Sequence, residues 1–235
     1  MRAFANRNIF IDYTCSYLST HALTVCTFNS AQYAGLAEIT LPNKQAYCMR
    51  NGYELISTFD AGNAFDGWDR VRLVAEVLPQ FDAVAWIDCD AVITNHDVAI
   101  ESIVGWEKRS IGPSFFMSYD VNGPNSGTFI ARNTPIARQF FHALLKAGRP
   151  LVGSHHWQEQ EAMIRFLASP PYAHGFVGWV DPSVMNAYVH AEHGWPEDFV
   201  GAWNDKSWIM HMAGLALWRK IELAREYVGK MKRAS

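Results

Sequence analysis

Several features that would assign the chain to a class are missing from its sequence. No apolar run approaches the roughly 18–20 residues that a membrane-spanning helix needs. The N-terminus lacks the basic-then-apolar layout of a signal peptide. A net charge of −3 over 235 residues gives no general attraction to nucleic acid or to anionic membranes. We therefore expect a cytoplasmic or otherwise soluble protein with no membrane span and no nucleic-acid partner.

Cysteine and the common phosphate-binding motifs are also scarce. The four cysteines lack paired metal-ligand spacing, so we expect them to be thiols in a reducing compartment. Neither Gly-x-Gly-x-x-Gly nor the Gly-Lys-Ser/Thr signature of a P-loop occurs. The phosphates of any bound nucleotide would therefore have to be held in another way.

What the sequence does contain is an alternation of apolar strands and amphipathic helices. Hydrophobic residues make up 49% of the chain and charged residues 18%, which is typical of a globular protein. Strands are predicted at 22–28, 53–57, 83–87, 114–119, 127–131, 176–180 and 208–212. Helices are predicted at 31–38, 42–49, 68–78, 135–146, 158–167 and 217–232. The alternation predicts an α/β fold, a Rossmann-like and mainly parallel sheet flanked by helices, with a mixed second half.

Three local expectations complete this outline. Residues 1–21 show no clear period and are expected to be a lead-in to a single domain at 22–235. Pro42 suits the first turn of a helix, so a helix is expected to begin there. Residues 120–126 are polar and contain Gly and Pro, and they are expected to form a turn where backbone can approach a ligand.

The chemistry of the chain is expected to centre on Asp88 and Asp90. The apolar run 83–87 reads as a buried parallel strand that delivers both carboxylates to a sheet edge, where open α/β folds bind ligands. Two adjacent carboxylates beside an apolar strand are costly unless hydrogen bonds or a cation offset their repulsion. Carboxylate oxygens suit Mg²⁺ or Mn²⁺, which keep positions open for substrate phosphates. The pattern therefore predicts a metal and a phosphate at this edge.

Two other interpretations of the Asp-x-Asp stretch are open. It is a weak motif by itself, because surface turns often contain aspartates that bind nothing. It also fits phosphatases of the haloacid dehalogenase class, with Asp88 as nucleophile and Asp90 as acid/base. That class usually continues with Gly-Thr near the start of its fold, whereas Ala91 and Val92 follow here and two strand–helix units precede the aspartates.

Several stretches taken together, in their order and spacing, point to one family. They are NKQAYCMRNGY (43–53), WDR (68–70), DCD (88–90), NSGTFIARN (125–133), EQEAM (159–163), NAY (186–188) and HMAG (211–214). In this order, over roughly residues 22–214, the chain resembles the GMA12/MNN10-type galactosyl and xylosyl transferases, glycosyltransferase family 34. The catalytic domain of that family has the GT-A fold.

The resemblance implies a metal-dependent, retaining transfer of a hexose or pentose from a nucleotide-diphosphate sugar to a hydroxyl of a glycan acceptor. The donor would be a UDP-sugar or, as the second choice, a GDP-sugar. The implied ligands of Mn²⁺ (or Mg²⁺) are Asp88, Asp90 and His211, and the implied catalytic residues are Glu159 and Gln160. The other residues implied to contact the donor are Thr27, Asn29, Lys44, Arg70, Cys89, Asn125, Ser126, Gly127 and Gly214.

One departure from the family bears on activity. Many relatives place a Cys and a nearby Lys after the His-Phe-Ala-Gly motif, where the Lys can meet the diphosphate, but this chain has Leu215 and Ala216. The negative charge of the leaving diphosphate would then have to be stabilised by the metal and by Arg70, Lys44 or Arg219. A sugar-nucleotide or glycan-binding protein without turnover is therefore an open alternative.

Overall fold

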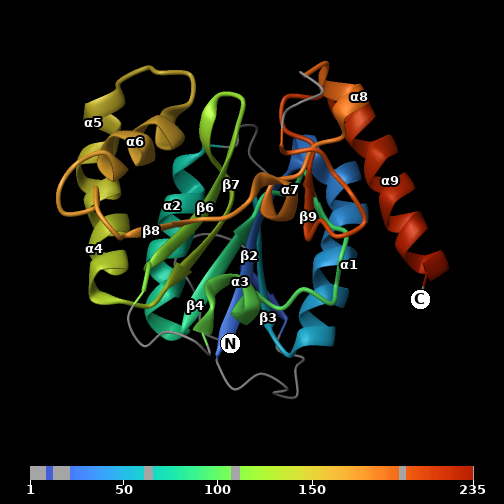
Figure 1. The fold of residues 1–235 in the computed structure, drawn as a ribbon, viewed down its shortest axis with the longest axis horizontal. Coiled ribbons are helices and arrows are strands. Elements are labelled where there is room, and N and C mark those ends of the chain that lie inside the picture. The colour runs from blue at the N-terminus through green and yellow to red at the C-terminus, as the bar shows by residue number, and fades with distance from the viewer. Residues whose placement is uncertain (1–8, 13–21, 61–65, 107–111, 196–199, 235) are drawn as a thin grey trace.

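The computed structural model of the chain describes residues 9–12, 22–60, 66–106, 112–195 and 200–234. Its centre is a seven-stranded sheet with the order β1-β3-β2-β4-β7-β6-β8 (Figure 1). The strands are β1 (Ile9–Asp12), β2 (Leu23–Ser30), β3 (Glu54–Asp60), β4 (Ala83–Ile87), β6 (Phe115–Asp120), β7 (Gly123–Arg132) and β8 (Val177–Trp179).

The pairing of the strands confirms the predicted sheet. Strand β2 pairs in parallel with both β3 and β4, whereas β7 runs antiparallel to β4 and β6. Strand β8 is parallel to β6. The parallel centre followed by a mixed second half is the α/β arrangement that the sequence indicates.

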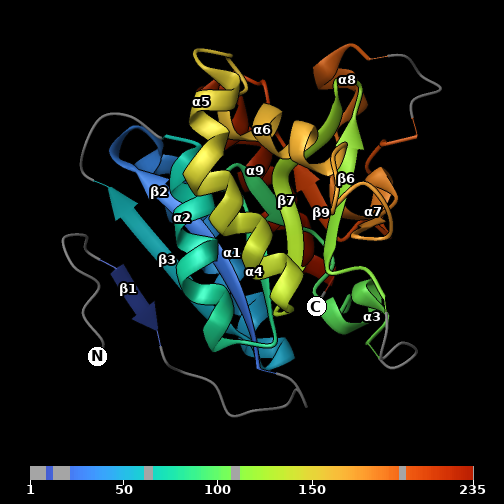
Figure 2. The same ribbon diagram turned by 90° about the vertical axis from the view of Figure 1, so that its left-hand side faces the viewer.

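Helices cover both faces of this sheet (Figures 1 and 2). Helices α1 (Ala34–Asn51) and α9 (Leu217–Ala234) lie on one side, and α2 (Trp68–Val77), α4 (Pro135–Ala143) and α6 (Gln158–Leu167) lie on the other. Strands β2 and β4 are buried along their whole length because both of their faces are covered. The shorter helices are η1 (Ala31–Tyr33), η2 (Leu78–Gln80), α3 (Ile100–Val104), η4 (Leu144–Gly148), α5 (Arg149–Val152), α7 (Pro182–Met185) and α8 (His190–His193).

A second, two-stranded sheet positions the site. Strand β5 (Ala91–Ile93) runs antiparallel to β9 (Ile209–His211), with Ala91 opposite His211. The sequence predicts the strand at 208–212 but not its partner, because three residues are too few to show a period. The pairing places a histidine from near the end of the chain beside the Asp-x-Asp stretch.

The expected start of a new helix at Pro42 is wrong. Helix α1 runs without interruption from Ala34 to Asn51 and contains Pro42. Proline removes one backbone hydrogen bond from a helix interior. The buried face that continues across it, with Leu36, Thr40, Lys44 and Tyr47 at helical spacing, outweighs that loss.

The expected turn at 120–126 is much shorter in the structure. Only Val121 and Asn122 connect β6 to β7, and Asn125 and Ser126 are buried residues within β7. The register between β6 and β7 shifts at Met117/Ser118. The prediction was wrong because it took polar side chains as a sign of a loop, whereas these side chains bond to other buried groups described below.

One element of the N-terminal lead-in lies among the described residues. Ile9–Asp12 forms β1 and pairs antiparallel with β3, and the rest of residues 1–21 lies outside the described part of the chain. Cys26, Cys48 and Cys89 are present as thiols, and Cys15 also lies outside the described residues. Within the described ranges, no helix combines the length and the apolar character needed to cross a membrane.

Candidate metal and sugar-nucleotide site

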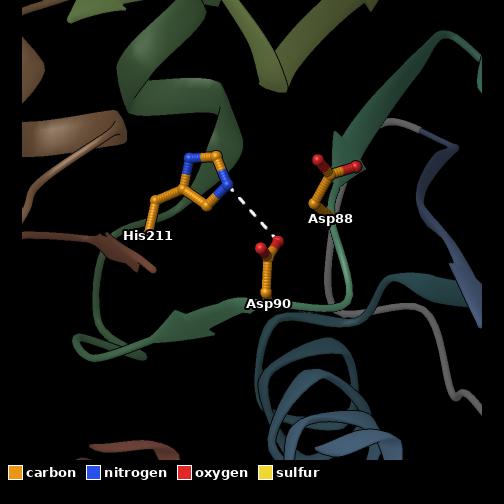
Figure 3. Close-up of side chains that lie close together, drawn as sticks. All are labelled: Asp88, Asp90 and His211. Carbon is orange, nitrogen blue, oxygen red and sulfur yellow. Dashed lines mark ion pairs between the residues drawn. The ribbon is translucent and has the colours of Figure 1, made fainter. Parts of the chain in front are cut away.

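Three side chains from two distant segments converge at the end of β4. Asp88 and Asp90 follow that strand directly, and His211 is the last residue of β9 (Figure 3). The potential ligand atoms of these residues all lie within 4.8 Å of one another. The backbone fixes this arrangement, since the amide of Asp88 donates to the carbonyl of Gly127 (2.9 Å) and the amide of Met212 to the carbonyl of Asp90 (3.0 Å).

Asp90 faces two potential cations. Its Oδ1 lies 3.4 Å from His211 Nε2, and its Oδ2 accepts a hydrogen bond from Lys220 Nζ at 2.6 Å. Burial alone would raise the pKa of Asp90, but its contacts with His211 and Lys220 outweigh that effect and hold the pKa well below its usual range. The carboxylate is therefore ionised throughout the physiological range.

Asp88 has a different environment. Its Oδ1 accepts from the indole of Trp86 (2.7 Å), and its Oδ2 lies 3.2 Å from Arg70 Nη2. Burial raises the pKa of Asp88, and the neighbouring charge of Asp90 adds to this, against the opposing effect of Arg70. The two carboxylates thus differ in proton affinity, as expected for a close pair of like charges.

His211 is held by its other ring nitrogen. Its Nδ1 lies 2.7 Å from Asn186 Oδ1, which sets Nδ1 as a donor and turns Nε2 toward Asp90, where a bound cation would take its lone pair. A carboxamide or carboxylate behind a histidine in this way is the usual support of a metal-ligating imidazole. Two carboxylates and one oriented imidazole are a donor set that a divalent transition-metal ion accepts.

Gly127 provides the space for this ring. A Cβ atom at position 127 would lie 2.3 Å from His211 Cε1 and 2.9 Å from Nε2. Any larger residue would therefore displace the imidazole. The glycine of the predicted Asn-Ser-Gly stretch is required by close packing against the proposed metal ligand rather than by backbone conformation.

The three side chains open onto a cleft of about 320 Å³. Ten of the sequence-predicted site residues line it: Arg70, Asp88, Asp90, Asn125, Ser126, Gly127, Glu159, Gln160, His211 and Gly214. The same wall includes Gly67, His156, Trp157, Gln158 and Ala213, which are not among the predicted site residues. The structure thus brings most of the predicted site together in one place.

Arg70 ties the two sides of the cleft together. Its Nη1 donates to the carbonyl (2.6 Å) and the hydroxyl (2.8 Å) of Ser126, and its Nε lies 3.4 Å from Glu159 Oε1. Gln160 Oε1 accepts from the backbone amide of Ser126 (3.0 Å). Burial raises the pKa of Glu159, opposed by the guanidinium of Arg70. The predicted catalytic pair therefore sits on a rigid network that also contacts Asp88.

The remaining predicted residues lie away from the cleft wall. Thr27 is fully buried in β2 at the centre of the sheet, and Asn29 donates to Ser57 Oγ (2.9 Å). Lys44 is fully buried and donates to the carbonyl of Ala91 (2.8 Å). Cys89 packs against the apolar cluster beneath α9. Contact of these four residues with the donor stays a prediction.

Two more residues, which contact the proposed metal ligands from behind, were also given no role from the sequence. Asn186 belongs to the recognised Asn-x-Tyr stretch, which was a signal, but no role followed from it. Lys220 gave no such signal. The basic residue expected near the diphosphate was its neighbour Arg219, which in the structure binds Glu192 (2.8 Å from Nε to Oε2). The contact between Lys220 and Asp90 spans 130 positions of the chain. Such a pairing leaves no local pattern.

Comparison with solved structures identifies the class of fold. A glycosyltransferase involved in the glycosylation of the major capsid of PBCV-1 matches with a TM-score of 0.67 at 16% identity, covering 87% of this chain and 99% of that chain. The galactosyltransferase LgtC, solved with donor and acceptor sugar analogs, matches with a TM-score of 0.54 at 13% identity, covering 88% and 95% respectively. The fold is that of GT-A glycosyltransferases.

The family follows from the sequence itself. The model of the galactosyl transferase GMA12/MNN10 family matches residues 20–109 and 107–221, and the chain belongs to that family. This membership removes the support for the phosphatase alternative.

Two curated relatives match at low identity. An uncharacterized alpha-1,2-galactosyltransferase of Schizosaccharomyces pombe is 23% identical over 231 residues, 81% of this chain and 59% of that protein. The probable alpha-1,6-mannosyltransferase MNN10 of Saccharomyces cerevisiae is 20% identical over 230 residues, 81% of this chain and 58% of that protein. The chain therefore spans somewhat over half the length of these relatives.

Proposed function

We propose that the protein is a metal-dependent glycosyltransferase that moves a sugar from a nucleotide-diphosphate donor to a hydroxyl group of a glycan acceptor. The observation that carries this proposal is the convergence of Asp88, Asp90 and His211 on a cleft that also contains Glu159 and Gln160. Membership of a transferase family supports the class of reaction. The metal, the donor and the stereochemistry are part of the proposal.

Asp88, Asp90 and Nε2 of His211 would hold the cation. Carboxylates suit Mg²⁺ and Mn²⁺ alike, but imidazole is a ligand typical of transition metals, which favours Mn²⁺. A divalent cation bound here would stabilise the negative charge that develops on the departing diphosphate. Asn186 keeps the imidazole oriented so that Nε2 faces the carboxylates (2.7 Å from Nδ1 to Oδ1).

The protein's own groups would stabilise the opposite charge. As the bond to the diphosphate breaks, the anomeric carbon becomes cationic, and fixed dipoles or carboxylates placed near it lower the barrier. Glu159 and Gln160 are the groups on the cleft wall suited to this role. Their contacts with Arg70 and Ser126 hold them in place, so little reorganisation is needed during the reaction.

The donor is proposed to be a UDP-sugar, with a GDP-sugar as the second choice. The names of the two curated relatives mention galactose and mannose transfer, so a hexose is the first sugar to test. Transfer is proposed to retain the anomeric configuration. This follows from the family resemblance. Because no carboxylate among the described residues is a convincing covalent nucleophile, we favour attack on the same face of the sugar, assisted by the leaving phosphate oxygen.

The test is the thermal midpoint of the protein with nucleotides and nucleotide sugars in Mn²⁺, Mg²⁺ or EDTA, followed by a transfer assay. A ligand at about 100 times its dissociation constant stabilises by roughly 2.7 kcal/mol. We expect a metal-dependent shift with UDP species for the wild type. The shift should disappear in Asp90→Asn and persist in Asp97→Asn, a control whose carboxylate pairs with Arg50 on the surface.

Each result has a distinct meaning. A shift that EDTA abolishes, together with transfer or donor hydrolysis, supports the proposal. A shift without any turnover would instead support a sugar-nucleotide-binding protein. If no nucleotide shifts the midpoint with either metal, the cleft is not a donor site and the proposal fails.

A further inference from the structure

Each carboxylate of the Asp-x-Asp stretch is paired with a buried side-chain cation. Lys220 Nζ lies 2.6 Å from Asp90 Oδ2, with 7% of the lysine side chain exposed. Arg70 Nη2 lies 3.2 Å from Asp88 Oδ2, with 6% of the arginine side chain exposed. The negative charge of the two carboxylates is therefore already matched by two cations of the protein.

The two cations differ in their freedom to leave. Arg70 is bound on several sides, because its Nη1 donates to the carbonyl and the hydroxyl of Ser126 while its Nε faces Glu159. Lys220 is a compact charge at the end of a flexible four-carbon chain. Its ammonium also lies 5.6 Å from the centre of the Tyr33 ring, a second favourable position within a small movement of Asp90.

A divalent cation at this place would meet the ammonium of Lys220. Both are attracted to Asp90, and they repel each other at close range. Asp88, Asp90 and Glu159 share Arg70 and Lys220 and carry with them a net charge of −1, so a divalent cation would bring this group to +1, an excess of positive charge. A diphosphate would neutralise that excess and would give the ammonium a new anionic partner.

We propose that Lys220 is an internal counter-cation that competes with the divalent metal for Asp90 and thereby couples metal binding to diphosphate binding. This inference rests on the proposed function. The metal alone binds weakly, because the ammonium must be displaced from Asp90. With the diphosphate present, the metal binds tightly, since the displaced ammonium of Lys220 then pairs with the diphosphate. Each ligand strengthens the binding of the other by the same factor.

The test measures Mn²⁺ affinity directly, by electron paramagnetic resonance of free Mn²⁺, with and without UDP. In the wild type, UDP should tighten Mn²⁺ binding by about tenfold or more, within the usual range of coupling between sites. In Lys220→Met, Mn²⁺ without UDP should bind about tenfold tighter, whereas the tightening by UDP should fall. Lys220→Gln carries the same test if Lys220→Met does not fold.

Two further variants separate charge from structure. Lys220→Arg keeps the positive charge and should retain weak binding of Mn²⁺ alone. Lys230→Met removes an exposed lysine of the same helix, one that pairs with Glu226 at 2.8 Å, and should leave both affinities unchanged. Loss of a lysine with a merely structural role would not tighten the binding of Mn²⁺ alone while reducing the further tightening by UDP.

The outcomes distinguish this inference from the proposed function. If the wild type binds Mn²⁺ in neither condition, the proposed function fails and the inference fails with it. If the wild type binds Mn²⁺ and UDP, but the neutral variants bind Mn²⁺ alone no more tightly than the wild type, the inference is overturned and the proposed function stands.

Discussion

Nδ1 of His211 lies 2.7 Å from Oδ1 of Asn186, and this contact decides which nitrogen of the ring faces the acidic pair. Asn186 is itself fixed, since its Nδ2 donates to the hydroxyl of Tyr188 (3.3 Å) and that hydroxyl donates to Asp120 Oδ2 (3.1 Å). All of these groups are buried. The imidazole is therefore oriented by a chain of hydrogen bonds that begins in β6.

Replacing Asn186 by Leu should weaken metal binding without removing a ligand. Leucine cannot accept a hydrogen bond from Nδ1, so nothing fixes the tautomer and the orientation of the ring. Loss of such a support typically lowers metal affinity by about 10–100-fold. The measurement is Mn²⁺ affinity in the presence of UDP. Asn186→Asp, which keeps an acceptor, should retain binding, and Tyr188→Phe should lose less than Asn186→Leu. Wild-type affinity in Asn186→Leu would show that the contact does not position the ring.

The sequence was sufficient for the first half of the fold for a physical reason. Strands β2 and β4 are covered on both faces, so their burial appears as continuous apolar runs, and the abrupt change to Asp88 and Asp90 marks the sheet edge. Three of the sheet's strands, helix α2 and the acidic pair could therefore be predicted from local patterns, whereas α1 was divided at Pro42. The place of His211 came from the family resemblance and not from any pattern.

The rest depended on contacts between distant parts of the chain. Strand β5 is too short to show a period, and it exists because β9 pairs with it. Asn125 appeared to be a turn residue, but its Nδ2 donates to Asp120 Oδ2 (2.8 Å) inside the sheet. Lys220 reaches Asp90 only because α9 packs against α1 and β5. Local sequence cannot report such pairings.

Gly127→Ala should disturb the proposed metal site through one added methyl group. The new Cβ would lie 2.3 Å from His211 Cε1 and 2.9 Å from Asn125 Oδ1, and both neighbours are buried side chains with fixed partners. Overpacking of this kind costs about 1–3 kcal/mol of unfolding free energy. We expect this loss in urea unfolding, together with loss of the metal-dependent thermal shift.

The matched control for that substitution is Gly229→Ala in α9. A Cβ at position 229 meets nothing within 4 Å, and the residue lies in the interior of a helix. Alanine is favoured over glycine there by about 0.5–1 kcal/mol, so this variant should be more stable than the wild type and should keep the thermal shift. If Gly127→Ala behaves like Gly229→Ala, close packing on His211 is not the reason for the glycine.

Lys44 should make the stability of the protein depend on pH in the alkaline range. The side chain is fully buried on α1, and burial lowers its pKa from 10.5 to about 8, against the opposing charges of Asp90 and Asp88. The folded protein therefore releases this proton at lower pH than the unfolded chain does. Between pH 8 and 10.5 the unfolded chain holds more protons, so the free energy of unfolding rises with pH.

The measurement compares urea unfolding of the wild type and Lys44→Met at pH 7, 8, 9 and 10. Other groups titrate in both proteins, so the difference between their unfolding free energies isolates Lys44. That difference should be constant below about pH 8 and then shift in favour of the wild type, by up to roughly 3 kcal/mol in total. The hydrogen bond from Nζ to Ala91 O survives deprotonation, because a neutral amine still donates. A difference that stays flat from pH 7 to pH 10 would mean that the buried amine titrates at an ordinary pKa.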